Sequence, residues 1–285
     1  MPLQLTYAQL QQRSGARRSE VQATLEAAVA STTTDVAPSV ALVPHHLADD
    51  SKRLALATAQ TALAAYPGDA QVTYALGQAQ LAAGESQQAI RSFKQVAAAR
   101  PGEPEVLLEL ARAHRAAGQP APALAVLDEL LQVQPRFVPA HRLRVELAID
   151  RQDWTAATAL AQAQQKREPT RPEGWFWQAA VHGAQRQWEP AAAALRQALA
   201  KGGGAEVAVR LVSVLRAAGQ AGEAQRFAAQ WQEQQPRDTV LRMALADLAG
   251  RGGDLAGAEQ LYRAVLEIEP EHAAAPAIES RPASR

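Results

Sequence analysis

Residues 70–103 read AQVTYALGQAQLAAGESQQAIRSFKQVAAARPGE. Two sets of apolar side chains in this stretch recur every three or four residues: Val72, Ala75, Leu76, Ala79 and Ala83, then Ala89, Ile90, Phe93, Val96 and Ala97. This spacing places each set on one face of an α-helix. Gly84 lies between the sets, where glycine permits the positive φ of a sharp turn, and Pro101 cannot continue the second helix. The stretch therefore predicts two helices joined by a tight turn.

The same pattern recurs along the chain with a period of 34 residues. Prolines keep this period in two runs: Pro67, Pro101, Pro135 and Pro169, then Pro236 and Pro270. A column of alanines keeps it as well: Ala55, Ala89, Ala123, Ala157, Ala191, Ala224 and Ala258. Both patterns share one deleted residue, because the alanine column shortens its step to 33 between Ala191 and Ala224. The chain is therefore a tandem array of helix pairs.

Side-chain size at the repeated positions favours close helix packing. The alanine column lets the two helices of a pair cross closely, because a larger side chain would overpack the contact. Larger apolar residues occupy the core positions: Leu42, Leu76, Leu110, Leu211 and Leu245 on first helices, and Phe93, Leu127, Leu195 and Tyr262 on second helices. Glycine returns at the turn as Gly118, Gly219 and Gly253. We expect an all-α fold.

A unit with Leu76-Gly77, a turn glycine, a small alanine, an aromatic residue four positions later and a closing proline resembles the tetratricopeptide repeat. The resemblance implies an α-solenoid, a right-handed superhelix of antiparallel helix pairs with about eight 34-residue repeats. The units are assigned as a degenerate one at 2–35, then 36–69, 70–103, 104–137, 138–171, 172–204, 205–238 and 239–272. Residues 273–285 contain Pro276 and Pro282 and no apolar stripe, so we expect a disordered tail.

Several positions depart from the pattern. Arg144 and Gln178 stand where the first-helix leucine belongs, and we expect the bulky Trp175 to compensate. Pro44 falls inside a predicted first helix. Three glycines at 202–204 replace the closing proline, and they admit two interpretations. They form either a flexible joint between the blocks 2–201 and 205–272, or a tight turn at the site of the deletion.

Composition excludes several classes of function. The chain has 285 residues, with 29 Lys and Arg against 29 Asp and Glu, so its formal charge is zero and no nucleic-acid partner is expected. Cysteine is absent, which removes disulfides, thiolate metal sites and cysteine nucleophiles. No apolar run is long enough to cross a bilayer, so membrane insertion is not expected. No signal peptide is recognisable, which predicts a cytoplasmic protein.

A closer resemblance lies in residues 210–270. The matching residues are Arg210-Leu211, Gly219, Ala224, Arg226-Phe227-Ala228, Trp231, Pro236, Asp238, Tyr262-Arg263-Ala264-Val265-Leu266 and Pro270. They resemble the tetratricopeptide-repeat protein of bacterial PEP-CTERM/exosortase systems. That family accompanies exopolysaccharide genes and is exported, so the resemblance implies a periplasmic location, in conflict with the absent signal. That family often has a lipidated N-terminus, whereas this sequence contains no cysteine.

The resemblance to tetratricopeptide proteins implies a concave wall formed by first helices, and this wall contains our candidate site. Arg112, Arg115 and Arg142 fall on it in adjacent units, with Leu108, Phe176 and Tyr74 as apolar neighbours. Arginine forks bind carboxylates and an aromatic ring anchors an apolar side chain, so we predict a groove for an acidic or extended peptide. The alternative is an ordinary solvated surface, because Arg142 has Glu146 at i+4 and Arg112 has Glu109 at i−3. The lysine and asparagine with which chaperone-binding members grip a terminal carboxylate are missing.

No catalytic motif is present, and we expect neither an enzyme, nor a cofactor, nor a metal site. The histidines lack metal-ligand spacing, and Trp154, Trp175, Trp188 and Trp231 are interpreted as packing residues. Two functions remain. The first is a non-enzymatic scaffold that binds a protein or peptide, in exopolysaccharide or protein-sorting machinery. The alternative is an accessory arm of a glycosyltransferase or another envelope-biogenesis enzyme.

Overall fold

The structure is a computed structural model that describes residues 3–31 and 34–270. Within these residues it contains sixteen α-helices and no strand, which confirms the all-α expectation. In chain order they are α1 (Leu3–Ser14), α2 (Arg18–Ser31), α3 (Ala37–Ala48), α4 (Lys52–Ala65), α5 (Ala70–Ala82), α6 (Ser86–Ala99), α7 (Pro104–Ala116), α8 (Pro120–Val133), α9 (Val138–Asp150), α10 (Trp154–Arg167), α11 (Glu173–Ala184), α12 (Trp188–Ala200), α13 (Ala205–Ala217), α14 (Ala221–Gln234), α15 (Thr239–Arg251) and α16 (Leu255–Ile268).

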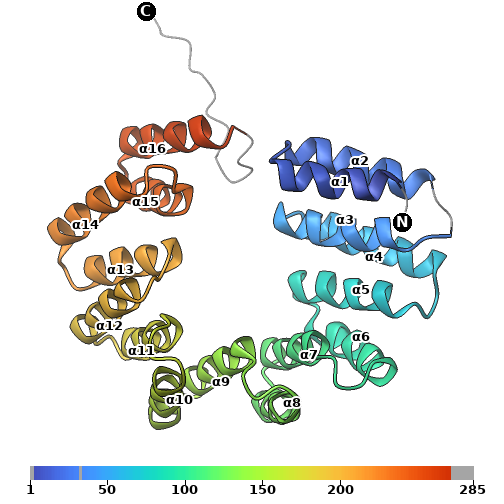
Figure 1. The fold of residues 1–285 in the computed structure, drawn as a ribbon, viewed down its shortest axis with the longest axis horizontal. Helices are drawn as coiled ribbons and strands as arrows, with labels where there is room; N and C mark the ends of the chain where they lie inside the picture. The colour runs from blue at the N-terminus through green and yellow to red at the C-terminus, as the bar shows by residue number, and fades with distance from the viewer. Residues whose placement is uncertain (1–2, 32–33, 271–285) are drawn as a thin grey trace, which may run out of the picture. The chain divides into compact units, whose positions relative to one another are not determined.

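The chain divides into two compact units between Leu147 and Ala148, inside α9. In the first unit, α1 packs on α2, α3 on α4, α5 on α6 and α7 on α8, and α2, α4 and α6 also pack on the next first helix (Figure 1). In the second unit, α10 packs on α11, and the pairs α11–α12, α13–α14 and α15–α16 follow. First helices of successive pairs are also in contact: α3 contacts α5, and α13 contacts α15. This is the predicted arrangement of stacked helix pairs.

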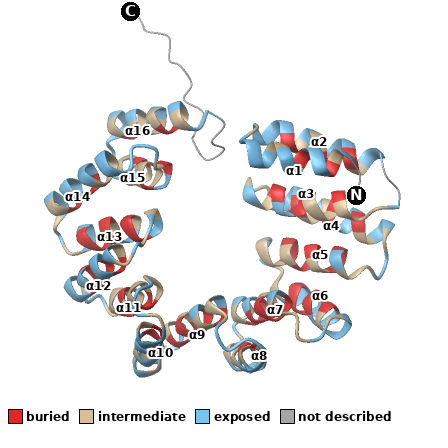
Figure 2. Cartoon of the chain, in the orientation of Figure 1, coloured by how far each residue is buried: buried red, intermediate tan, exposed pale blue. Residues whose placement is uncertain are grey.

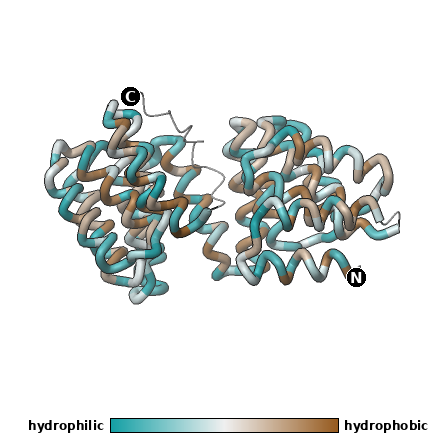
Figure 3. The backbone as a smooth tube through the Cα atoms, turned by 90° about the horizontal axis from the view of Figure 1, so that it is seen from above, coloured by the Kyte–Doolittle hydropathy of each residue, from teal (hydrophilic) through white to brown (hydrophobic). Residues whose placement is uncertain are grey.

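The alanine column is buried in the helix packing. Its seven members are at most 5% exposed. Burial is heavier on first helices such as α7 and α13 than on second helices such as α14 (Figure 2). A first helix is covered by its own partner and by helices of adjacent pairs, whereas a second helix keeps an outer face. Hydrophilic and hydrophobic stretches accordingly alternate along the helices (Figure 3).

The turn inside each pair uses a left-handed residue. The predicted glycines at 84, 118, 219 and 253 have φ between 69° and 83°. Three pairs make the same turn without glycine, since Asp50, Gln152 and Arg186 have φ of 53°, 57° and 57° at the matching positions. The turn with Gly118 and the turn with Arg186 have the same backbone hydrogen bond. Gln119 N donates to His114 O in the first and Gln187 N to His182 O in the second, both at 2.9 Å. Backbone geometry is therefore retained where the residue type is not.

The departures from the repeat are accommodated locally. Helix α3 runs through Pro44. Arg144 lies 3.5 Å from Asp128 in an ion pair, and the Gln178 carbonyl accepts a hydrogen bond of 2.7 Å from Gln165. Trp175 is only half-buried, although it packs against the core of the second unit. The tryptophan that is buried is Trp177, at 4% exposure, which the repeat pattern did not indicate.

One hydrophobic core runs across the three glycines at 202–204. It joins Leu195 and Ala198 before them to Val207, Leu211 and others after them. A Cβ at Gly203 would lie 2.8 Å from the carbonyl oxygen of Ala198, and Gly202 has φ +84°. This close packing favours the tight-turn interpretation, and the flexible joint stays a prediction. The expected tail at 273–285 lies outside the described residues.

Candidate partner-binding face

The candidate arginines lie on α7 and α9. Helix α7 begins at Pro104, whose fixed φ suits the first helical position. Its buried side is formed by Val106, Leu107, Leu110 and Ala111 among others. Arg112 and Arg115 are three residues apart, so they are neighbours on the helix surface, and both side chains reach solvent.

Ion pairs connect all three arginines to carboxylates. Arg112 Nη1 lies 2.7 Å from Glu109 Oε1 on the same helix. Arg142 Nε donates to Glu146 Oε1 at 2.9 Å, and Arg115 Nη1 on α7 donates to the other oxygen, Glu146 Oε2. One carboxylate thus holds guanidinium groups from two successive first helices together.

The local electrostatics differ between the two carboxylates. Burial raises the pKa of Glu109, and the opposing effect of Arg112 does not cancel it. The Glu109 side chain is 14% exposed, whereas Glu146 is 30% exposed. Burial, followed by the nearby Glu109 and Glu105 carboxylates, raises the pKa of Tyr74 to about 12. Tyr74 therefore stays neutral at physiological pH.

The aromatic candidates are partly structural. The Tyr74 ring meets the Phe93 ring edge-on, with centroids 5.7 Å apart, and it packs against the core beneath. Phe176 lies in the second unit, half-buried against the core of that unit. Leu108 was expected to flank the groove, but it is 6% exposed and belongs to the core between α7 and α8. That expectation is wrong, because the helix turns Leu108 inward.

The structure therefore brings Arg115 and Arg142 onto one carboxylate, with Arg112 one turn from Arg115. Phe176 belongs to the second compact unit. The residue pattern identified the pairs within a helix, Arg112 with Glu109 and Arg142 with Glu146. It missed the pair between Arg115 and Glu146, which are 31 residues apart and meet only because the fold brings these two side chains of α7 and α9 together.

The described part of the chain contains no group of three or more side chains placed to hold a metal ion. Among the described helices, none is both long and apolar enough to cross a membrane.

Comparisons with known proteins identify the repeats. Two tetratricopeptide-repeat family models match, one over residues 40–104 and one over 81–147. No curated protein matched the chain by sequence.

Solved structures share the fold at low sequence identity. A tetratricopeptide repeat protein from Parabacteroides merdae is 14% identical with a TM-score of 0.63, and the match covers 81% of this chain and 91% of that one. Tom70 from yeast is 12% identical with a TM-score of 0.64, over 88% and 55%. A protein of the same repeat from Thermus thermophilus is 23% identical with a TM-score of 0.53, over 64% and 99%. The chain therefore has the tetratricopeptide-repeat fold, which generally serves protein interaction.

Proposed function

We propose that this protein is a non-enzymatic scaffold that binds an extended, acidic segment of a partner protein. The contact surface is the first-helix face with Arg112, Arg115 and Arg142, and it is bordered by Tyr74. Phe176, on α11 of the second unit, is a separate candidate contact of that unit. Repeat arrays bind partners on such extended faces.

The observation that supports this proposal is the carboxylate of Glu146 between Arg115 and Arg142. Two guanidinium groups on neighbouring helices are already spaced to hold one carboxylate. A carboxylate of the partner can displace Glu146 from the two guanidinium groups or bind beside it. Hydrogen bonds between guanidinium and carboxylate groups are charge-assisted and stronger than neutral ones.

The alternative is that these arginines and glutamates form ordinary solvated ion pairs on the surface and bind no partner. Exposed ion pairs contribute about 0–1 kcal/mol, so their presence alone does not indicate a site. The two interpretations differ in what happens when Glu146 loses its charge. A binding face gains affinity for an acidic peptide, because the internal competitor is removed, whereas a solvated surface gains nothing.

Fluorescence polarisation with two labelled peptides tests the proposal. One peptide alternates Glu and Leu, and the matched peptide carries Gln in place of Glu. We expect the acidic peptide to bind the wild type more tightly, Glu146→Gln to bind it more tightly still, and the double variant Arg112→Ala/Arg115→Ala to bind it about tenfold or more weakly.

Arg263→Ala is the matched control for these variants. Arg263 is also an exposed arginine paired with a glutamate one turn away, at 2.5 Å from Glu259, but it lies on α16. Its replacement should leave peptide binding unchanged. Equal binding of both peptides, or equal binding by the wild type and the double variant, would contradict the proposal.

We further propose the PEP-CTERM/exosortase setting for this scaffold, supported by the resemblance over residues 210–270. The neighbouring genes test this setting. Exosortase and exopolysaccharide genes beside this one would support it. A neighbouring glycosyltransferase gene without an exosortase would favour the accessory-arm alternative.

A further inference from the structure

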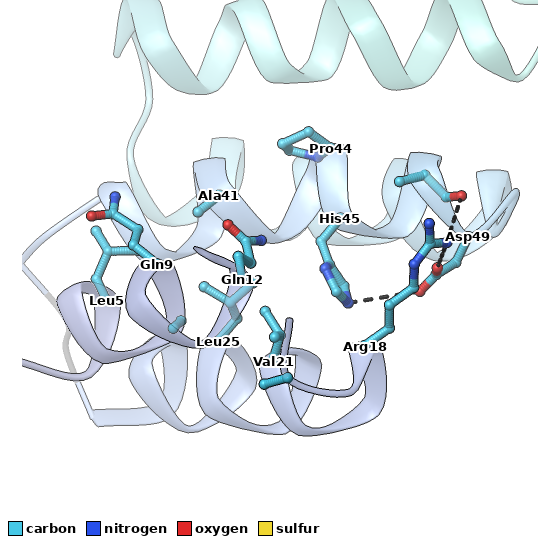
Figure 4. Close-up of a pocket in the computed structure, with 13 residues that line it drawn as sticks. Leu5, Gln9, Gln12, Arg18, Val21, Leu25, Ala41, Pro44, His45 and Asp49 are labelled. Carbon is cyan, nitrogen blue, oxygen red and sulfur yellow. Dashed lines mark hydrogen bonds and ion pairs between the residues drawn. The ribbon is translucent and has the colours of Figure 1, made fainter. Parts of the chain in front are cut away.

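A cavity of about 540 Å³ lies among α1, α2 and α3 in the first compact unit (Figure 4). Helix α1 packs on α2, and α2 packs on α3. Where α1 and α3 border the cavity, several side chains are small, among them Ala8, Ala41 and Ala48. Larger side chains at these positions would fill the space, so the small alanines leave the cavity open. Its size lies within the range of small-molecule sites.

One end of the cavity carries no charged side chain, and the other, the polar end, holds an ion pair. Leu5, Leu25 and Ala41 line the first, and Arg18 and Asp49 line the second (Figure 4). The lining residues on α1 run from Leu5 to Gln12, and Ala16 lines it just beyond that helix. The helical part of this lining, from Leu5 to Gln12, is about 10 Å long at 1.5 Å per residue. The cavity is therefore elongated, with its charged pair at one end and the amides of Gln9 and Gln12 along α1.

The polar end is electrically balanced. Arg18 Nη1 donates to Asp49 Oδ1 at 2.8 Å and to the Ala48 carbonyl oxygen at 3.3 Å. The charges of Arg18 and Asp49 cancel within this pair. Because the pair has no net charge and the Arg18 side chain is 52% exposed, a charged head group gains little attraction at this end.

His45 supplies an unsatisfied polar atom at this end. The residue is 9% exposed, and its Nε2 makes no hydrogen bond. The carboxylate oxygen that faces it, Asp49 Oδ2, lies 3.7 Å from His45 Nε2, which is beyond hydrogen-bond distance. Buried polar atoms normally have a partner, so this nitrogen marks a place for one.

We propose that this cavity binds a linear aliphatic molecule with one uncharged hydrogen-bonding head group, such as a hydroxyl, placed at His45. The aliphatic chain lies along α1 toward Leu5. The proposal is independent of peptide binding at the arginines, because it uses other helices and a different chemistry.

Three probes of equal chain length test the head group: 1-octanol, octanoate and octylammonium. Amide chemical shifts of the full-length protein at pH 8 report binding. We expect saturable shifts of residues in α1 and α3 with 1-octanol and weaker binding of both charged probes. An absence of saturable shifts up to the solubility limit of octanol would overturn the proposal, as would tighter binding of either ion.

A variant that fills the cavity tests the location. Ala48 is exposed on α3, so Ala48→Leu extends a side chain over the cavity without overpacking the core. We expect it to weaken octanol binding at least about tenfold. Ala82→Leu is the matched control, because Ala82 occupies the same register one repeat later and does not line the cavity. Equal weakening by both variants would overturn the assigned location.

A second variant tests the head group contact. His45→Phe keeps a ring of similar size and removes Nε2. We expect it to weaken octanol binding about 2- to 10-fold, the range of one hydrogen bond, and to leave the binding of octane unchanged. Equal losses for octanol and octane would show that His45 acts only through packing, and the head group would then have to be placed elsewhere.

Discussion

Replacing Arg186 by glycine should stabilise the second compact unit. Arg186 makes the turn between α11 and α12 with φ +57°, the left-handed region that glycine occupies in the turns at 84, 118, 219 and 253. A left-handed conformation costs a residue with a Cβ about 1–2 kcal/mol. Glycine loses more backbone entropy on folding, about 0.5–1 kcal/mol. The net gain for Arg186→Gly is therefore about 0.5–1 kcal/mol.

Tryptophan fluorescence measures this gain selectively. All five tryptophans, at 154, 175, 177, 188 and 231, lie in the second unit, so their signal in a urea titration follows the unfolding of that unit. A stabilisation of 1 kcal/mol would also raise the thermal midpoint by a few degrees, about 2–4 °C. Gln152→Gly should behave in the same way, because Gln152 has φ +57° at the matching turn.

Two further variants separate backbone strain from the loss of the arginine side chain. Arg186→Ala removes the same charged group and keeps a Cβ, so it should give no such gain. Gly219→Ala should lose about 1 kcal/mol, although a Cβ there would meet no atom within 4 Å. If Arg186→Gly and Arg186→Ala unfold at the same urea concentration, the reasoning from backbone conformation is refuted.

Other perturbations test the core and the titratable groups. Gly77→Ala should destabilise the first unit by about 1–3 kcal/mol in urea, because its Cβ would lie 2.7 Å from the Phe93 ring, and adding Phe93→Leu should recover part of the loss. Burial raises the pKa of Glu109, so its contribution to stability is present below its unfolded pKa and is lost as the pH rises through its folded pKa. The stability difference between the wild type and Glu109→Gln should therefore shift in favour of the wild type as the pH falls from 7, and a constant difference in thermal midpoint would contradict this. The Tyr74 phenol should titrate near pH 12 by ultraviolet absorbance, with stability lost between about pH 10 and 12 relative to Tyr74→Phe.

The sequence by itself determined the repeat and the helix pairs. A 34-residue period, apolar residues at helical spacing and an alanine column constrain the chain locally, because each pair packs only on its neighbours. The seven alanines are indeed buried, and the turn glycines have positive φ. Residues that are near in sequence account for these features, so the pattern predicts them.

Only the tertiary structure decided features that depend on how two helices are placed. The left-handed turns at Asp50, Gln152 and Arg186 show no signal in residue type, because packing of the flanking helices imposes the turn. The Arg115–Glu146 pair and the α1–α2–α3 cavity arise from distances between helices, as does the burial of Trp177. A repeat pattern specifies which face of a helix is apolar. It does not specify whether the facing side chains meet, share a carboxylate or leave a space, since that depends on side-chain volumes contributed by separate helices.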